Sequence, residues 1–443
     1  MLGTSVSITP KCLVRCAVWS LLGCLLMLSG CNGSNGANGS NGANGSNSRA
    51  DTTQAGATTI FSTVTSPTSS PSYPGIPLGE RPAALARALG LPNRLLVGLG
   101  TGAEIGEIKR QAIPRIDLYD RYFNHVTGEP GKVSWVDWTK PAGDYVFQVA
   151  RAAEAVGAVP MITLYQMATR GDSNLSGLTE PRFMQSYWAN VKLLLQKLGT
   201  YNKPALINLE PDFWGYSHRL AIDHNPATVV VRVKVNAECA DLADHLPGFT
   251  ECFLRMARRY APKTKVGLPP SDWGERPTQQ VVDYMRAAGA AQADFVVMQT
   301  LDGDAGCFEA RQAPYCTRPN IQYWDELNQQ SPNFREHLGA ARLFHEQLGL
   351  PLIWWQTPMG VASPKPGGQP GRWRDNRMQY FLTHPQELVA VGAVAVVFSK
   401  ANPGNTDLTT DGGQFQRLFT RYVQQPAPLT APLTVTAPKS ISP

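Results

Sequence analysis

Residues 204–214 read PALINLEPDFW, an apolar run that ends in two carboxylates, a proline and two aromatic side chains. A strand that is buried on both faces reads as a continuous apolar segment, as in a parallel sheet covered by helices. Because side chains alternate along a strand, we expect Leu206, Asn208 and Glu210 to share one face. Ligands of parallel α/β folds bind beyond the carboxyl ends of the strands, so we expect Glu210 at the mouth of a barrel.

Apolar runs of this kind recur along the chain and alternate with segments of helical periodicity. Eight strands are predicted, at residues 95–100, 116–123, 159–165, 205–209, 265–268, 294–300, 352–355 and 393–398. Helices are predicted at residues 104–110, 145–155, 181–198, 249–260, 278–288, 334–348, 376–391 and 414–423. This alternation indicates right-handed βαβ units and a parallel sheet. The predicted fold class is α/β, a single (β/α)8 (TIM) barrel at residues 79–425.

The longest predicted loops all follow strands. They cover residues 124–141, 214–248, 301–332 and 357–374. Loops after the strands form the active face of such a barrel, and long loops in a compact domain are usually functional. We therefore expect the functional site on this face.

The N-terminus has the organisation of an export signal. Lys11 and Arg15 precede an apolar stretch at residues 16–28, which is too short for a comfortable membrane span. The sequence Leu28-Ser29-Gly30-Cys31 then resembles the bacterial lipobox, in which the cysteine is lipidated and becomes the mature N-terminus. An ordinary cleaved signal followed by a chance cysteine is the alternative.

The lipobox resemblance implies a signal peptide at residues 1–30 and a lipid anchor on Cys31 in the cell envelope. Asn32 follows the cysteine, and the lack of Asp there favours the outer membrane. Residues 31–78 are rich in Gly, Asn and Ser and then in Thr, Ser and Pro, which predicts a disordered linker. Residues 426–443 read as a Pro- and Thr-rich tail.

Composition excludes several classes of partner. The 443-residue chain has a formal net charge of +6, and loss of the two cations in the signal leaves +4. The charges are interspersed, without a basic stripe, so no nucleic-acid partner is predicted and the only membrane contact expected is the N-terminal lipid. The glycines of residues 98–102 do not have the dinucleotide-loop spacing. We predict neither a cofactor nor a metal; the sequence gives no oligomeric state.

Four cysteines follow the lipobox, and an exported protein meets an oxidising compartment. They fall as two close pairs, which predicts disulfides Cys239–Cys252 and Cys307–Cys316. A metal site is the competing interpretation, but these spacings fit no zinc pattern.

Glu210 is the first candidate for catalysis. A carboxylic acid at the end of a strand, in a cleft with aromatic walls, has a raised pKa and can protonate a leaving oxygen. The motif Asn208-Leu209-Glu210-Pro211-Asp212 resembles the barrel-type glycoside hydrolases, several families of which carry the acid on strand four. The resemblance implies that Glu210 is the general acid. A structural salt bridge or a helix N-cap is the alternative.

The second carboxylate departs from that resemblance. In the commonest retaining clan the nucleophile is a Glu that closes strand seven, whereas this chain has Gln356 there. We therefore expect the second carboxylate elsewhere and favour Asp302 or Asp212, which lie close to strand ends. The other open candidates are Asp117, Asp120, Asp272 and Asp304.

Aromatic side chains gather at or just after the predicted strand ends. Flat rings suit the apolar faces of sugars, and their polar edges can bind hydroxyl groups. Trp354 and Trp355 point to opposite sides of a strand, so at least one of them belongs to the core. The predicted substrate-binding residues are Tyr165, Trp214, Trp273, Trp355, Gln356 and Trp373.

Together these features predict an exported, lipid-anchored glycoside hydrolase that acts on a poly- or oligosaccharide by carboxylate acid/base chemistry. The alternative is a catalytically inactive barrel that serves as a surface glycan-binding or cell-envelope scaffold protein, which Gln356 makes plausible. A barrel hydrolase of another polymer is a third hypothesis.

Overall fold

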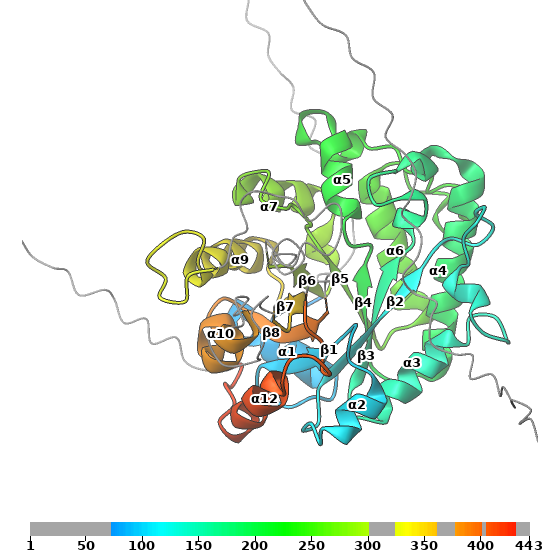
Figure 1. The fold of residues 1–443 in the computed structure, drawn as a ribbon. Coiled ribbons are helices and arrows are strands. Elements are labelled where there is room, and N and C mark those ends of the chain that lie inside the picture. The colour runs from blue at the N-terminus through cyan, green and yellow to red at the C-terminus, as the bar shows by residue number, and fades with distance from the viewer. Residues whose placement is uncertain (1–71, 301–323, 361–376, 401–404, 431–443) are drawn as a thin grey trace, which may run out of the picture. The chain divides into compact units, whose positions relative to one another are not determined.

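The computed structural model describes residues 72–300, 324–360, 377–400 and 405–430 (Figure 1). Six residues with predicted or candidate roles lie outside these ranges: Cys31, Asp302, Asp304, Cys307, Cys316 and Trp373. The described residues all belong to one compact unit.

The strands form a closed parallel barrel in the order β1-β2-β3-β4-β5-β6-β7-β8. Their bounds are β1 Leu96–Leu99, β2 Leu118–Asn124, β3 Val159–Tyr165, β4 Ala205–Leu209, β5 Thr264–Leu268, β6 Phe295–Met298, β7 Leu352–Pro358 and β8 Ala393–Ser399. The pairing of β1 with both β2 and β8 closes the ring. All predicted strands are present, so the predicted (β/α)8 fold is confirmed.

Helices surround this barrel (Figure 1). Their bounds are α1 Arg81–Ala88, α2 Ile105–Arg110, α3 Tyr145–Glu154, α4 Pro181–Tyr201, α5 Phe213–Leu220, α6 Leu246–Tyr260, α7 Thr278–Ala287, α9 Phe334–Leu348, α10 Arg377–Thr383, α11 Pro385–Val389 and α12 Gln414–Gln424. The prediction of one helix at residues 376–391 is wrong, because Pro385 begins a new helix after α10. Helices α1 and α5 were not predicted.

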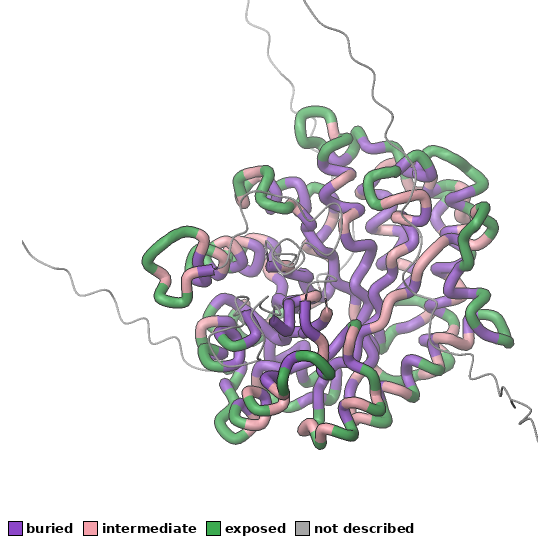
Figure 2. The backbone as a smooth tube through the Cα atoms, in the orientation of Figure 1, coloured by how far each residue is buried: buried purple, intermediate pink, exposed green. Residues whose placement is uncertain are grey.

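Helix α4 illustrates how the sequence builds the outer layer. The apolar positions recur at helical spacing, and Phe183, Tyr187, Val191 and Leu194 are all buried. Burial of each such side chain contributes about 1.5–3 kcal/mol to folding. Asn202, which follows the helix, has a left-handed φ of 52° and its N–H binds the carbonyl of Leu198, which ends the helix. Figure 2 shows the resulting pattern of buried strands and helices with exposed outer sides.

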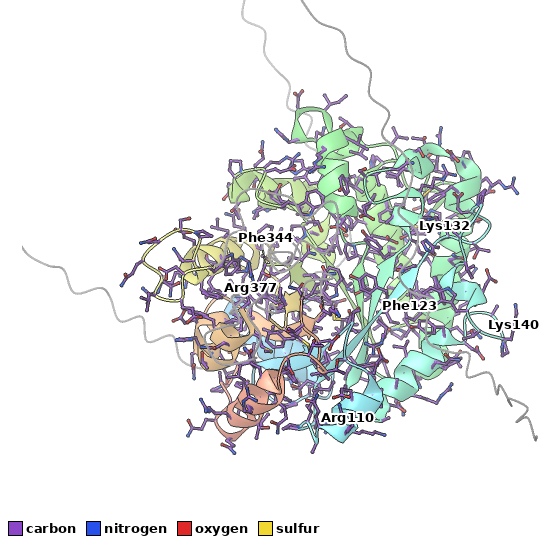
Figure 3. The ribbon with its side chains drawn as sticks, viewed as in Figure 1. Arg110, Phe123, Lys132, Lys140, Phe344 and Arg377 are labelled. Atoms are coloured by element: carbon purple, nitrogen blue, oxygen red, sulfur yellow. A yellow bond between two sulfur atoms is a disulfide. The ribbon has the colours of Figure 1, made fainter. Side chains whose placement is uncertain are left out.

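Aromatic rings fill the space between the barrel and the helices. The ring of Phe123, labelled in Figure 3, packs on Trp135 and Tyr145 with centroids 5.0 and 4.9 Å away. Gly267 in β5 lies against the ring of Phe295, and a Cβ at that glycine would come within 2.1 Å of the ring. Glycine is therefore required there for the ring of β6 to pack.

The packed body extends past both predicted limits. The Tyr73 hydroxyl donates to the Asp294 carbonyl at 2.7 Å, so residues before 79 belong to the body. The Leu95 amide donates to the Ala427 carbonyl at 2.9 Å, and the Ala427 and Leu429 side chains are buried. The predicted tail therefore begins too early, because its first residues cover the base of β1.

The predicted Cys239–Cys252 disulfide is confirmed, with an S–S distance of 2.02 Å. It joins the turn Ala237–Cys239 to α6. The predicted Cys307–Cys316 pair lies outside the described residues. Within the described ranges, no helix has the length and apolar character needed to cross a membrane. The same ranges contain no cluster of three or more His, Cys, Asp or Glu side chains suited to a metal ion.

Candidate active site

Two residues with left-handed backbone conformations follow β4. Glu210 has a φ of 51° and Asp212 has a φ of 66°, with Pro211 between them. The Glu210 amide still binds the Leu164 carbonyl of β3 at 2.8 Å, and α5 begins directly after Asp212. Non-glycine residues rarely adopt this conformation, and such outliers cluster at functional sites. Here the two turns give the two carboxyl groups different surroundings.

Glu210 is completely buried. Its Oε2 accepts hydrogen bonds from the backbone amides of Gln166 at 2.8 Å and Met167 at 2.9 Å. Its Oε1 has no hydrogen-bond partner, and the hydroxyl of Tyr187 on α4 is near enough to lower its pKa. Burial outweighs these contacts and raises the pKa of Glu210 to about 8.

The expectation that Glu210 continues the face of Leu206 and Asn208 is therefore wrong. Asn208 donates to the Thr163 hydroxyl at 3.3 Å, whereas Glu210 binds the amides that follow β3. The left-handed φ of Glu210 breaks the alternation of side chains that an extended strand would give. A carboxyl with no exposed surface, held by two amides, is suited to holding a loop in place.

Asp212 is partly exposed and lies at the carboxyl end of the barrel. Its Oδ2 accepts a hydrogen bond of 2.7 Å from the Tyr165 hydroxyl, and its amide donates to the Ser271 hydroxyl at 3.0 Å. Burial raises the pKa of Asp212 to about 6, the Tyr165 hydrogen bond lowers it, and the negative charge of Asp172 raises it further. Asp212 is thus a partly accessible carboxyl that titrates near pH 6, closer to neutrality than an ordinary aspartate.

Asp172 is the second carboxyl beside Tyr165. It comes from the segment after β3 and is exposed. Burial raises the pKa of Tyr165 far above its usual range, and the negative charges of Asp212 and Asp172 raise it further. The two carboxyls thus converge on one tyrosine hydroxyl. Sequence analysis missed Asp172 because it stands seven residues beyond a strand end, although Tyr165 itself was predicted.

Asp120 and Trp355 lie deeper in the barrel. The Trp355 indole donates to Asp120 Oδ2 at 3.0 Å, and the Thr163 hydroxyl donates to Oδ1 at 2.6 Å. Burial raises the pKa of Asp120 to about 6, while these hydrogen bonds lower it. Trp355 is 2% exposed, so it supports the site from below and has little surface for a sugar.

Gln356 occupies a bulge in β7. The pairing moves from Trp354–Val396 to Thr357–Phe398, which leaves one extra residue on β7 between these pairs. Gln356 has a φ of 54° there, is partly exposed, and donates its amide to the Tyr122 hydroxyl at 2.9 Å.

Trp354 points to the opposite side of β7 from Trp355, as predicted. Its indole donates to His337 of α9 at 2.8 Å, so it belongs to the layer between the barrel and the helices.

Trp273, after β5, forms an exposed aromatic surface with Tyr216 of α5. The ring centroids are 4.7 Å apart, and Trp273 is 37% exposed. The Arg219 guanidinium lies 4.8 Å from the Tyr216 centroid and 4.7 Å from that of Trp273. Burial raises the pKa of Tyr216, and the charges of Asp212 and Asp172 add to the shift. The aromatic pair is therefore within electrostatic reach of the two carboxyls.

Trp214 does not contact this site. It is fully buried, its indole donates to the Leu209 carbonyl at 2.8 Å, and its ring packs on Phe213 and Phe249. The prediction that Trp214 binds substrate is therefore wrong, because α5 turns its ring into the core.

Two of the other carboxyls have structural partners. Asp117 pairs with Arg94 at 2.8 Å before β2 begins, and Asp272 pairs with Arg276 at 3.0 Å.

No protein-family model matches this sequence, and no curated protein matches it either. Among solved structures, the chain is similar to a hyperthermophilic endo-β-1,4-glucanase in complex with substrate, at 10% identity over 77% of this chain and 100% of that one, with a TM-score of 0.43. A GH53 catalytic domain from Ignisphaera aggregans matches at 10% identity over 78% and 98% of the two chains, with a TM-score of 0.42.

A D-psicose 3-epimerase from Clostridium cellulolyticum is also similar, at 12% identity over 74% and 99% of the two chains, with a TM-score of 0.36. The similar structures thus include glycoside hydrolases and an epimerase. At these identities and scores the similarity does not assign a reaction to this chain. The chemistry is therefore inferred from its own residues.

Proposed function

We propose that the protein is a glycoside hydrolase that acts on a poly- or oligosaccharide, with Asp212 as the general acid. The observation that carries this proposal is the meeting of Asp212 and Asp172 at the Tyr165 hydroxyl, on the active face of the barrel. A general acid needs a pKa near the working pH and a position that substrate can reach. Asp212 combines both, because its pKa is about 6 and its side chain is partly exposed.

In the proposed reaction, Asp212 transfers its proton to the glycosidic oxygen while the bond from that oxygen to the anomeric carbon breaks. A water then adds to the anomeric carbon and gives its proton to a carboxylate. Asp172 raises the proton affinity of Asp212 through its negative charge. Asp302, which lies outside the described residues, stays a candidate for the carboxylate that takes the proton from water.

Glu210 takes a positioning role in this proposal. It binds the amides of Gln166 and Met167, which directly follow the tyrosine that contacts Asp212. With a pKa of about 8, its carboxyl keeps its proton at neutral pH and needs no ion pair in the core. It therefore fixes the end of β3, and with it Tyr165, without meeting substrate.

The aromatic surface supports a carbohydrate as the substrate class. Trp273 and Tyr216 present rings beside the carboxyls, and rings of this kind stack on the apolar faces of sugars. Close packing holds this surface next to Asp212: a Cβ at Gly215 would approach the Trp273 ring to 2.9 Å.

Export and anchoring are part of the same proposal and rest on the sequence at Cys31. A lipid on that cysteine would hold the barrel in the cell envelope, on the outer membrane. Mass spectrometry of the mature N-terminus tests this, because a diacylglyceryl group should be found on Cys31 and should be lost in Cys31→Ser. An unmodified N-terminus elsewhere in the chain would refute it.

The activity is tested with purified wild-type protein on a panel of β-1,4-linked glucans and mannans and their tetra- to hexasaccharides, with release of reducing ends as the readout. The proposal expects turnover of at least one member. Binding without turnover across the panel would instead favour the inactive glycan-binding barrel that Gln356, in place of a strand-seven carboxylate, suggests.

A further inference from the structure

We infer that Tyr122 and Gln356 form a hydrogen-bonding pair that selects the sugar bound next to Asp212: Tyr122 donates its hydroxyl hydrogen to a substrate hydroxyl group, and Gln356 fixes the direction of that donation. This inference rests on the proposed function and extends it to the choice of substrate. It also gives a reason for the glutamine at the bulge of β7.

The hydroxyl group of Tyr122 can donate one hydrogen bond. A phenolic hydroxyl has one hydrogen to donate and lone pairs that accept. The Gln356 side-chain amide donates to this oxygen at 2.9 Å, so a lone pair is occupied and the hydrogen is directed elsewhere. No acceptor for that hydrogen occurs among the protein groups of the described ranges. Tyr122 is partly exposed, so the hydrogen is available to a ligand.

Two aromatic neighbours hold the ring of Tyr122 in place. Tyr122 packs edge-on against Tyr165, with ring centroids 5.9 Å apart. It also packs at a tilt against Trp355, with ring centroids 5.8 Å apart. Trp355 is itself held by its hydrogen bond to the buried Asp120 carboxyl. A donor whose ring is fixed from two sides loses little conformational freedom when a ligand binds.

Tyr122 is linked to the proposed acid through Tyr165. The hydrogen-bonding partner of Tyr165 is Asp212, so one ring contact and one hydrogen bond connect Tyr122 to the proposed acid. Burial raises the pKa of Tyr122, and the charges of Asp120, Asp212 and Asp172 add to the shift. Its hydroxyl therefore keeps its hydrogen across the working pH range and lies within electrostatic reach of all three carboxyls.

The side-chain amide of Gln356 does what a carboxylate at this position could not do. The bulge directs Gln356 to Tyr122, and an amide nitrogen can only donate there. An ionised carboxylate at the same position would accept the Tyr122 hydrogen and withdraw it from the substrate. It would also add a negative charge beside three other carboxyls. The glutamine therefore keeps Tyr122 as a donor toward the ligand.

The test uses Asp212→Asn as a parent that binds without turnover, and the panel tetrasaccharide that wild-type protein cleaves fastest. Calorimetry gives the Kd of the parent and of the same protein with Tyr122→Phe, Gln356→Glu or Tyr201→Phe. Tyr201 is the matched control, because its exposed hydroxyl binds Glu154 away from the site. Loss of one hydrogen bond to the sugar should raise the Kd roughly three- to tenfold for Tyr122→Phe, and Tyr201→Phe should leave it unchanged.

Gln356→Glu adds a readout that a merely structural role would not give. At acid pH the new carboxyl is protonated, can donate to Tyr122, and should give the Kd of the parent. As the pH rises and it ionises, the Kd should increase relative to that of the parent, in which Asp212 no longer titrates and residue 356 stays neutral. Asp120, Asp172 and Tyr165 lie near the pair in both proteins, so the comparison with the parent isolates the change at residue 356.

Equal Kd values for the parent, Tyr122→Phe and Gln356→Glu at every pH would overturn the inference. The same would follow from a Gln356→Glu Kd that is raised by an equal factor at acid and neutral pH. Turnover of no panel member by wild-type protein, or unchanged turnover by Asp212→Asn, would instead refute the proposed function. The two failures are therefore distinguishable.

Discussion

The carboxyl groups of Glu210 and Asp212 stand two residues apart at the end of β4 and meet different neighbours. Glu210 is completely buried against the amides after β3, and its pKa is about 8. Asp212 is partly exposed beside Tyr165 and Asp172, and its pKa is about 6. A place at a strand end therefore does not decide which carboxyl performs chemistry. The backbone conformation and the access of solvent decide it.

The largest expected effect is on turnover. Asp212→Asn removes the proposed proton donor and should lower kcat/KM on the cleaved oligosaccharide by roughly 10²–10⁴-fold. Glu210→Gln keeps one oxygen for the two backbone amides and places an NH2 toward Tyr187, so it should stay within about fivefold of wild type. Initial rates of the two variants side by side check this. A collapse of activity in Glu210→Gln, with Asp212→Asn active, would reverse the two roles.

Trp214 and Trp273 extend the same contrast to aromatic side chains. Trp214→Ala empties a core site and should lower the free energy of unfolding by about 3–5 kcal/mol. Trp273→Ala should leave unfolding nearly unchanged, because the ring is 37% exposed, and should raise KM instead. Urea denaturation and steady-state kinetics of both variants separate the two outcomes. A KM effect confined to Trp214→Ala would mean that Trp214, and not Trp273, meets the substrate.

The next effect is on stability at the carboxyls themselves. Glu210→Ala leaves the amides of Gln166 and Met167 without their acceptor in the core and should cost about 2–4 kcal/mol of unfolding free energy. Asp212→Ala removes a partly exposed group and should cost about 1 kcal/mol or less. Denaturant midpoints at fixed pH measure both. Equal losses would show that the two carboxyls are equally embedded.

Per unit of pH, the smallest effect is the pH dependence of stability. The folded-state pKa of Glu210 is raised, so its contribution to stability is fully present below the ordinary pKa of 4.5 and is lost as the pH rises toward about 8. The slope reaches about 1.4 kcal/mol per pH unit where only the unfolded chain is ionised. Glu210→Gln should remove this slope above pH 6, where the Asp212 contribution has ended. Parallel wild-type and Glu210→Gln curves would contradict the raised pKa.

The barrel itself was predictable because its strands are uninterrupted apolar runs. Residues 159–165 and 205–209 form β3 and β4 with the predicted bounds, since burial on both faces leaves a clear pattern in the sequence. Disulfide Cys239–Cys252 was equally readable from its spacing. The division of the helix at Pro385 could have been predicted from the proline, but the apolar periodicity continues across it.

The site was less predictable because its geometry depends on backbone turns and on distant loops. Alternation along β4 predicts a direction for Glu210, but its left-handed φ overrides that alternation. Trp214 follows a strand end yet turns into the core, because α5 begins one residue before it. Asp172 is distant in sequence from Asp212 and meets it only through Tyr165. Such contacts leave no periodic signal in the sequence.

Proton donation by Asp212 is tested most directly by comparing how far Asp212→Asn lowers kcat/KM on substrates with different leaving groups. A 2,4-dinitrophenyl glycoside of the cleaved sugar releases an anion that needs no proton, whereas the natural oligosaccharide releases a hydroxyl group that does. Asp212→Asn should therefore retain most of its kcat/KM on the dinitrophenyl glycoside and lose it on the oligosaccharide. An equal loss on both substrates, or this pattern in Glu210→Gln instead, would contradict the assignment of the acid to Asp212.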